Sequence, residues 1–178
     1  MKLAVLLTVI FLLSLVIGCT RQTQPPSNTQ QGNQAQTQSQ PQPSGAKSER
    51  GTPAEAKAML QQAVAHYQEV GRKQALADFN AKKPPFGDRD LYVVCIGPNG
   101  VITANGGFPQ YVGLSPDVLK DADGKPVGKA IWDLGNSKAG GSVQYRWINP
   151  VSGKTEPKVF FGEKVGDDVC GVGAYNPQ

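Results

Sequence analysis

The stretch from Gly141 to Lys158 constrains the fold most, because its polarity alternates with a period of two residues. Tyr145 and Trp147 fall on one side of this pattern, and the more polar residues between them fall on the other. Such alternation is typical of a β-strand with one buried face. Turn-forming residues at 149–153 interrupt the pattern, and a second apolar run begins beside Lys158. The stretch therefore predicts a β-hairpin.

The hairpin brings two large aromatic residues and a cation within reach of each other. Tyr145 and Trp147 each combine an apolar ring with one polar group, and Lys158 adds a positive charge. These side chains are a candidate site for a small anion. The alternative is that both aromatics are ordinary core residues and that Lys158 is a solvated edge residue, because aromatic stripes usually belong to the core.

The first residues indicate an exported protein. Lys2 precedes an apolar run, Leu3–Ile17, that is shorter than the ~20 residues a membrane-spanning helix needs. The run ends in Gly18-Cys19, which is similar to the bacterial lipobox, where the cysteine is acylated and the chain is cut before it. We therefore expect a signal peptide at 1–18 and lipidation of Cys19. The alternative is a plain secretory peptide with an incidental cysteine.

A lipidated Cys19 would anchor the chain stably to a membrane surface. Thr20 follows it where an inner-membrane retention signal would have aspartate, so we expect the periplasmic face of the outer membrane, or the cell surface, of a bacterial envelope. Residues 19–50 are rich in Gln, Ser, Thr and Pro and lack aromatic residues, which predicts a disordered tether. Residues 51–178 are long enough for one domain with a real core.

Composition and charge exclude several classes of function. The chain has 18 Lys and Arg and 14 Asp and Glu, and leaving out those before Gly51 gives the domain 14 basic and 13 acidic residues, so nucleic-acid binding has little support. The one histidine, His66, leaves no Cys/His metal site. Asp121 and Asp123 begin like a calcium loop but lack the later ligands. With no nucleophile beside a base, we expect neither an enzyme nor a cofactor or metal.

Two cysteines remain in the domain. Cys95 and Cys170 both lie in apolar, strand-like runs of a chain that we expect to be exported. A disulfide between neighbouring strands is the first interpretation. Two buried free thiols are the alternative, because free cysteine is often buried.

The remaining patterns predict an α+β domain in which a long N-terminal helix packs on a five-stranded antiparallel sheet. Thr52-Pro53-Ala54-Glu55 is a capping box, and Gly71 breaks or kinks the helix that follows. Asp167-Asp168 is interpreted as a solvated turn. We expect strands at 91–96 and 101–104, in the hairpin, and at 169–175. Short helical turns or loops are expected at 112–119 and 128–134.

These landmarks, in this order, resemble the single Cache domain, a PAS-like extracytoplasmic sensor module of bacterial chemoreceptors and histidine kinases. The resemblance covers roughly Glu55 to Tyr175. The matching pieces are 71–80, 86–93, 121–125, 145–150, 156–158 and 171–175.

The resemblance implies a pocket between the sheet and the middle segment that binds a small molecule, often a short carboxylate. Carried over by position, Tyr145, Trp147 and Lys158 would line this pocket, and Tyr92 and Phe86 would be further wall residues. A histidine often follows the alanine of the second strand in the family. Here Asn105 takes its place, and it does not titrate near neutral pH.

We therefore expect a lipid-anchored, extracytoplasmic domain of the sensory type that binds a small organic anion, such as a carboxylate. The chain ends at Gln178, shortly after the last strand, so we expect a membrane receptor or kinase partner to supply the output. The alternative is a docking lipoprotein with a vestigial pocket, which would bind a membrane partner or dimerise through its long helix.

Overall fold

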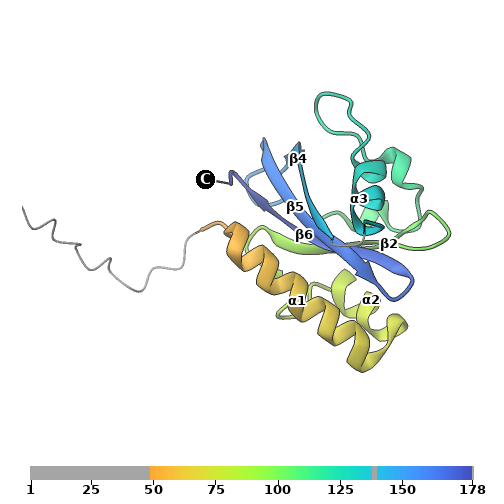
Figure 1. Ribbon diagram of the computed structural model, residues 1–178. Helices are drawn as coiled ribbons and strands as arrows, with labels where there is room; N and C mark the ends of the chain where they lie inside the picture. Colours follow the sequence, from red (N-terminus) through yellow and green to blue (C-terminus); the bar gives the residue numbers. More distant parts are fainter. Residues whose placement is uncertain (1–48, 138–139, 178) are drawn as a thin grey trace, which may run out of the picture. The chain divides into compact units, whose positions relative to one another are not determined.

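In the computed structural model, an antiparallel sheet carries α1 and α2 on one face and α3 on the other (Figure 1). Residues 49–137 and 140–177 are described, so the predicted signal peptide, Cys19 and most of the tether lie outside them. One compact unit comprises Ser44–Gln178. Both hydrophobic clusters of the described residues lie within it, so a chain that starts at Ser44 keeps the core.

The helices begin and end where local sequence signals place them. Helix α1, Pro53–Val70, starts with the predicted capping box, in which the Glu55 amide donates to Thr52 Oγ1 at 3.2 Å and the Thr52 amide donates to Glu55 Oε2 at 2.8 Å. Gly71 follows with φ of 79°, a conformation that favours glycine. The predicted break is therefore confirmed, and α2, Arg72–Asn80, starts a separate helix.

The sheet has the strand order β1-β2-β6-β5-β4, and β3 pairs with β2 on a separate path. The expected five strands are all present, and a sixth, β1, adds two residues beside the start of β2. Two residues are too few to produce a polarity pattern, which is why the sequence did not indicate this strand. The strands are β1 Gly87–Asp88, β2 Leu91–Ile96, β3 Ile102–Asn105, β4 Gly141–Ile148, β5 Thr155–Val165 and β6 Asp168–Tyr175.

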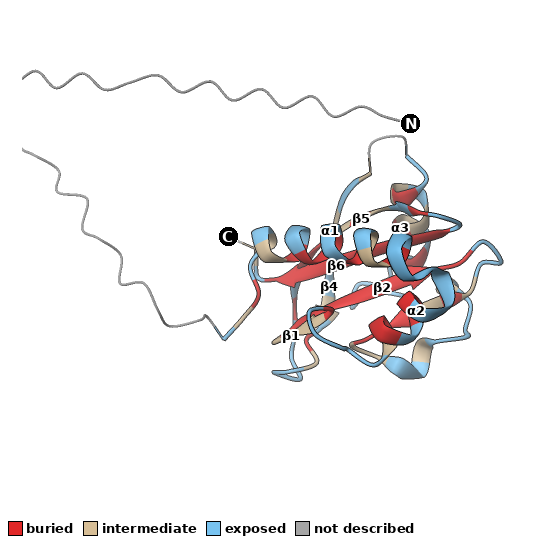
Figure 2. Cartoon of the chain, turned by 90° about the horizontal axis from the view of Figure 1, so that it is seen from below, coloured by how far each residue is buried: buried red, intermediate tan, exposed pale blue. Residues whose placement is uncertain are grey.

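Alternate residues of the central strands face opposite sides of the sheet and build two cores. Val93 and Cys95 of β2 pack with α1 and α2, whereas Tyr92, Val94 and Ile96 pack with α3 and the loops before it. Buried residues accordingly run along β2 and β6, as Figure 2 shows. The middle segment contains the short 3₁₀ helices Pro109–Tyr111 and Pro116–Val118 and the helix α3, Val127–Gly135.

A disulfide joins β2 to β6. Cys95 and Cys170 lie directly opposite each other in the strand register and are bonded, so the predicted disulfide is confirmed. The bond spans 75 residues of sequence. In the chain-entropy description a crosslink of this span stabilises the fold by about 4 kcal/mol.

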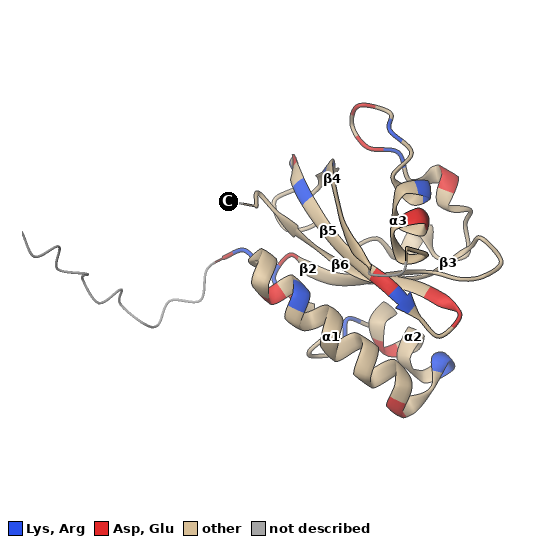
Figure 3. Ribbon diagram, viewed as in Figure 1, with Lys and Arg blue, Asp and Glu red and all other residues tan. Residues whose placement is uncertain are grey.

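Charged residues of both signs occur on either side of the sheet (Figure 3). Arg50, in the predicted tether, has its guanidinium on Glu156, which also accepts hydrogen bonds from Ser152 Oγ at 2.8 Å and Asn176 Nδ2 at 3.1 Å. Arg50 in particular lowers the pKa of Glu156 to about 2. The start of the domain and its last described residues therefore meet at one carboxylate.

Asp168 is completely buried, which corrects its interpretation as part of a solvated turn. The turn is one position earlier, and Asp168 begins β6. Its carboxylate accepts hydrogen bonds from Tyr67 Oη at 2.6 Å, Arg72 Nε at 2.7 Å and Thr103 Oγ1 at 2.8 Å. One side chain thus connects α1, α2, β3 and β6.

Replacing Asp168 with asparagine is expected to lower the free energy of unfolding by about 3 kcal/mol, because it removes the charge that Arg72 and Tyr67 surround. The neighbouring Asp167→Asn is the matched control, since Asp167 is exposed and should change stability by less than about 0.5 kcal/mol. Urea unfolding at pH 7 measures both. Equal effects would contradict the role assigned to Asp168.

Candidate functional site

Lys158 projects from β5 into the core on the face of the sheet away from α1, and only 2% of the residue is exposed. Its ammonium donates to Tyr92 Oη at 2.7 Å and to Tyr175 Oη at 3.2 Å. The Nζ atom also lies 4.1 Å and 4.3 Å from the ring centres of Tyr92 and Tyr175. Two tyrosines thus hold this cation through their oxygens and their ring faces.

Gly173 of β6 provides the space for the lysine. A Cβ atom at this position would lie 2.1 Å from Lys158 Cε. Only glycine therefore lets the side chain cross β6 and reach Tyr92 on β2.

The two tyrosines are themselves fixed by hydrogen bonds. Tyr175 Oη donates to the Ile148 carbonyl at 2.8 Å, and the Tyr92 and Tyr175 hydroxyl oxygens are 3.1 Å apart. Since Tyr175 uses its proton on Ile148, the Tyr92 hydroxyl is the donor between them. Burial raises the pKa of both phenols, so both remain neutral.

The charge of Lys158 is not matched by an acid. Burial lowers the pKa of its ammonium well below the ordinary value, and the Asp90 carboxylate offsets this only partly. Among the residues that the structure describes, no carboxylate forms an ion pair with Lys158. The site therefore combines a cation, neutral oxygen atoms and aromatic rings, which is a suitable environment for an anion.

Partly buried aromatic rings form the rest of the site. The ring centre of Phe108 lies 6.0 Å from that of Tyr92 and 6.3 Å from that of Trp147, and Tyr145 lies 6.0 Å from Trp147. Tyr111 also contacts this group, with its ring centre 6.3 Å from that of Trp147. These rings come from β4 and from the loop after β3.

Asn105 positions this loop. Its side-chain oxygen accepts a hydrogen bond from the Phe108 backbone amide at 2.9 Å, and its backbone amide donates to Asn80 Oδ1 at 2.9 Å. Asn105 is 3% exposed, at the end of β3. It therefore fixes the start of the segment that carries Phe108.

The structure brings most of the predicted residues together. Tyr92, Tyr145, Trp147 and Lys158 share one face of the sheet, and Asn105 lies at the start of the adjoining loop. The idea of Lys158 as a solvated edge residue is wrong, because the residue is buried.

Phe86 does not belong to this group. It packs on the opposite face of the sheet, with its ring centre 4.9 Å from that of Phe79 and 4.7 Å from that of His66. His66 packs against Phe86 there, and its Nε2 lies 2.8 Å from Asp78 Oδ2. Both residues lie away from the Lys158 cluster.

Three members of the site were missed by sequence reasoning, namely Tyr175, Phe108 and Tyr111. Residues two apart in a strand share a face, so the sequence alone could have placed Tyr175 on the same face as Gly171 and Gly173. Phe108 lies in a loop and Tyr111 ends the short 3₁₀ helix that follows, and neither segment is long enough for a periodic pattern to indicate where these side chains face.

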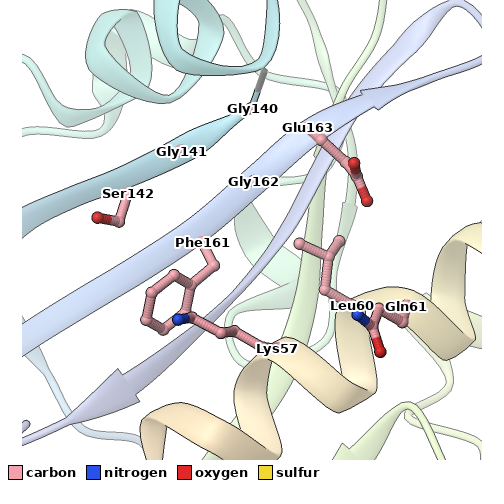
Figure 4. A pocket seen from close by; sticks show the side chains of 9 residues that line it. All are labelled: Lys57, Leu60, Gln61, Gly140, Gly141, Ser142, Phe161, Gly162 and Glu163. Carbon is pink, nitrogen blue, oxygen red and sulfur yellow. The ribbon is translucent and has the colours of Figure 1, made fainter.

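A hollow of about 390 Å³ lies on the other face, between α1 and the strands β4 and β5 (Figure 4). Lys57 and Phe161 lie against each other there, with the ammonium 4.8 Å from the ring centre. None of the predicted ligand-binding residues lines it. In the described parts of the chain, no group of acidic, histidine or cysteine residues suits a metal ion, and no helix is long and apolar enough to cross a membrane.

A helix-backed sheet whose other face carries a loop-covered polar cluster is a PAS-like fold. The chain belongs to the single Cache domain 2 family, whose model matches residues 44–167. Cache domains are extracytoplasmic sensor and ligand-binding domains. No curated protein matches the sequence significantly.

Solved structures with the same fold come from chemotaxis proteins. A methyl-accepting chemotaxis protein from Vibrio parahaemolyticus is 23% identical, with a TM-score of 0.58 over 68% of this chain and 86% of that one. A Cache chemosensory domain described for carboxylic acid recognition is 22% identical, with a TM-score of 0.58 over 69% and 92%. A periplasmic sensor domain of a chemotaxis protein is 20% identical, with a TM-score of 0.53 over 69% and 89%. These similarities establish the fold.

Replacing Lys158 with methionine is expected to leave the domain folded and at least as stable as before, because an apolar side chain of similar length replaces a buried charge. The lysine releases its proton more readily when folded than when unfolded. Its contribution to stability therefore rises with pH between its lowered pKa and 10.5. The free energy of unfolding of Lys158→Met should therefore increase less with pH than that of the unchanged protein, and urea unfolding across that pH range measures the difference. A loss of several kcal/mol in Lys158→Met would instead make the lysine a structural link.

Proposed function

We propose that this protein is a lipid-anchored, extracytoplasmic domain of the sensory type that binds a small carboxylate at Lys158. The observation that carries the proposal is the buried ammonium of Lys158, which hydrogen-bonds to two neutral tyrosines and forms no ion pair with any described carboxylate. Keeping a charge in such a place is costly unless a partner neutralises it. A ligand carboxylate would be that partner.

The surrounding groups suit carboxylate binding. A carboxylate would accept a charge-assisted hydrogen bond from Lys158 Nζ, and the neutral Tyr92 hydroxyl would become a second donor if its proton turned from Tyr175 Oη to the ligand. The aromatic residues Trp147 and Phe108 would exclude water and so strengthen the pairing. Among the neighbours of the fold, one was described for carboxylic acid recognition, which supports the same ligand class.

The proposed location rests on the N-terminal sequence and on the disulfide. Gly18-Cys19 after an apolar run supports acylation at Cys19 and hence a membrane anchor, most simply at the outer membrane. The bond between Cys95 and Cys170 fits an oxidising compartment outside the cytoplasm. A membrane receptor or kinase is the proposed partner that reads the ligand state.

Lipidation predicts that the protein incorporates labelled palmitate in cells and partitions into the membrane fraction. Cys19→Ala should abolish both, because Cys19 is the residue acylated in this proposal. Label in the variant equal to that in the unchanged protein would exclude Cys19 as the acylation site.

A docking lipoprotein with a filled pocket is the second candidate. It is favoured by the close packing around Lys158, whose side chain already occupies the space between Tyr92 and Tyr175. Dimerisation through an apolar face of α1 has less support, because the apolar residues Met59, Leu60 and Ala63 are buried within the domain.

Calorimetric titration of the Ser44–Gln178 unit with acetate, pyruvate, succinate and methylamine tests the two candidates. We expect binding of at least one carboxylate, and a loss of about 30-fold or more in Lys158→Met, since truncating one partner of a buried charge pair costs about 2 kcal/mol or more. Lys154→Met is the control, because Lys154 is exposed in the hairpin turn. Unchanged affinity in Lys158→Met would remove Lys158 from the site, and absence of carboxylate binding would favour docking.

A further inference from the structure

A ligand can reach Lys158 only if one of the residues that cover it moves. The tyrosines around Lys158 differ in how firmly they are held. Tyr92 and Tyr175 are at most 3% exposed and hydrogen-bonded to each other and to Lys158. Tyr145 is partly exposed, and among the described residues no hydrogen bond holds its hydroxyl. Tyr145 is therefore the most easily displaced of the three.

Tyr145 adjoins both Lys158 and a hollow. It lies directly opposite Lys158 in the register of β4 and β5. It also lines a groove of about 330 Å³ between α3 and β4. The same residue thus borders both the groove and the lysine cluster.

The groove has an apolar lining. Val127 and Ala130 of α3 face Val143 of β4 across it, and the charged groups Lys125 and Lys129 also border it. Lys129 is paired with Asp133, one turn along the helix. A charged ligand group in the groove would lose hydration against the aliphatic side chains, whereas an apolar group would gain from burial there.

We propose that the Tyr145 side chain moves aside to admit the ligand. The ligand is a monocarboxylate whose carboxylate pairs with Lys158 while its apolar tail occupies the groove between α3 and β4. This inference rests on the proposed function and narrows its ligand class. Acetate fills only the head position. A longer aliphatic acid fills both positions, whereas a dicarboxylate such as succinate would place a second charge against Val127, Ala130 and Val143.

Titration of the Ser44–Gln178 unit with acetate, butanoate, hexanoate and succinate tests the proposal. A methylene group gains up to about fourfold in affinity when fully buried, so we expect butanoate to bind about tenfold more tightly than acetate. Hexanoate should bind at least as tightly as butanoate, and succinate more weakly than butanoate.

Ala130→Leu would fill the groove from α3. It should reduce the difference between acetate and butanoate to less than about twofold while acetate still binds. Ala58→Leu is the matched control, because Ala58 lines a separate hollow beside α1 and should leave the tenfold difference unchanged. If Ala130→Leu fails to fold in a thermal scan, Ala130→Met supplies a more flexible filling side chain.

The outcomes separate this inference from the function on which it rests. Equal affinities for acetate and hexanoate, or a chain-length difference that survives in Ala130→Leu, would overturn the groove as the tail site and leave carboxylate binding at Lys158 intact. Succinate binding as tightly as butanoate would overturn the ligand class. Absence of binding by every acid would overturn the proposed function together with the inference.

Discussion

The fold depends on the pairing of β6 with both β2 and β5. The last strand lies between β5, from which a two-residue turn separates it, and β2, which ends at Ile96, so the sheet has no continuous centre until the C-terminal part of the chain is in place. Without β6, the hairpin of β4 and β5 would be separated from β1, β2 and β3. Asp168 starts this strand, Cys170 crosslinks it and Tyr175 ends it, so one element carries the main polar, covalent and functional contacts.

A polar route joins the functional site to the edge of the domain. Tyr175 connects Lys158 to the carbonyl of Ile148. The next residue, Asn149, donates to Asp90 Oδ2 at 3.0 Å and to Glu156 Oε2 at 3.2 Å, and Glu156 holds Arg50. The buried lysine and the point where the chain enters the domain therefore share one hydrogen-bonded network, in which each polar group is satisfied by its neighbour.

The parts that the sequence predicted are those that local chemistry determines. The capping box, Gly71 and the alternation around Tyr145 each act within a few residues, and the structure has each feature as expected. The hairpin register alone brings Tyr145 beside Lys158. The disulfide followed from two strand-like runs and an expected oxidising compartment.

The features that sequence reasoning missed depend on the order of strands in the sheet. Tyr175 meets Lys158 because β6 pairs with β5, and Asp168 is buried because α1, α2 and β3 converge on it. Phe86 lies only six residues before Tyr92 but on the other face, because β1 pairs Gly87 with Tyr92 and Phe86 comes one residue before Gly87. Pairings between distant segments leave no periodic trace in the sequence.

The disulfide also makes the two walls of the site unequal in stiffness. Tyr92 lies three residues before Cys95 and Tyr175 five residues after Cys170, so their strands are joined covalently close to the ammonium. Tyr145 and Trp147 lie on the edge strand β4, which only hydrogen bonds and side-chain packing hold. A molecule bound beside Lys158 would therefore contact crosslinked strands, β2 and β6, on one side and the edge strand β4 on the other. The structure would yield toward β4 and α3 rather than toward α1.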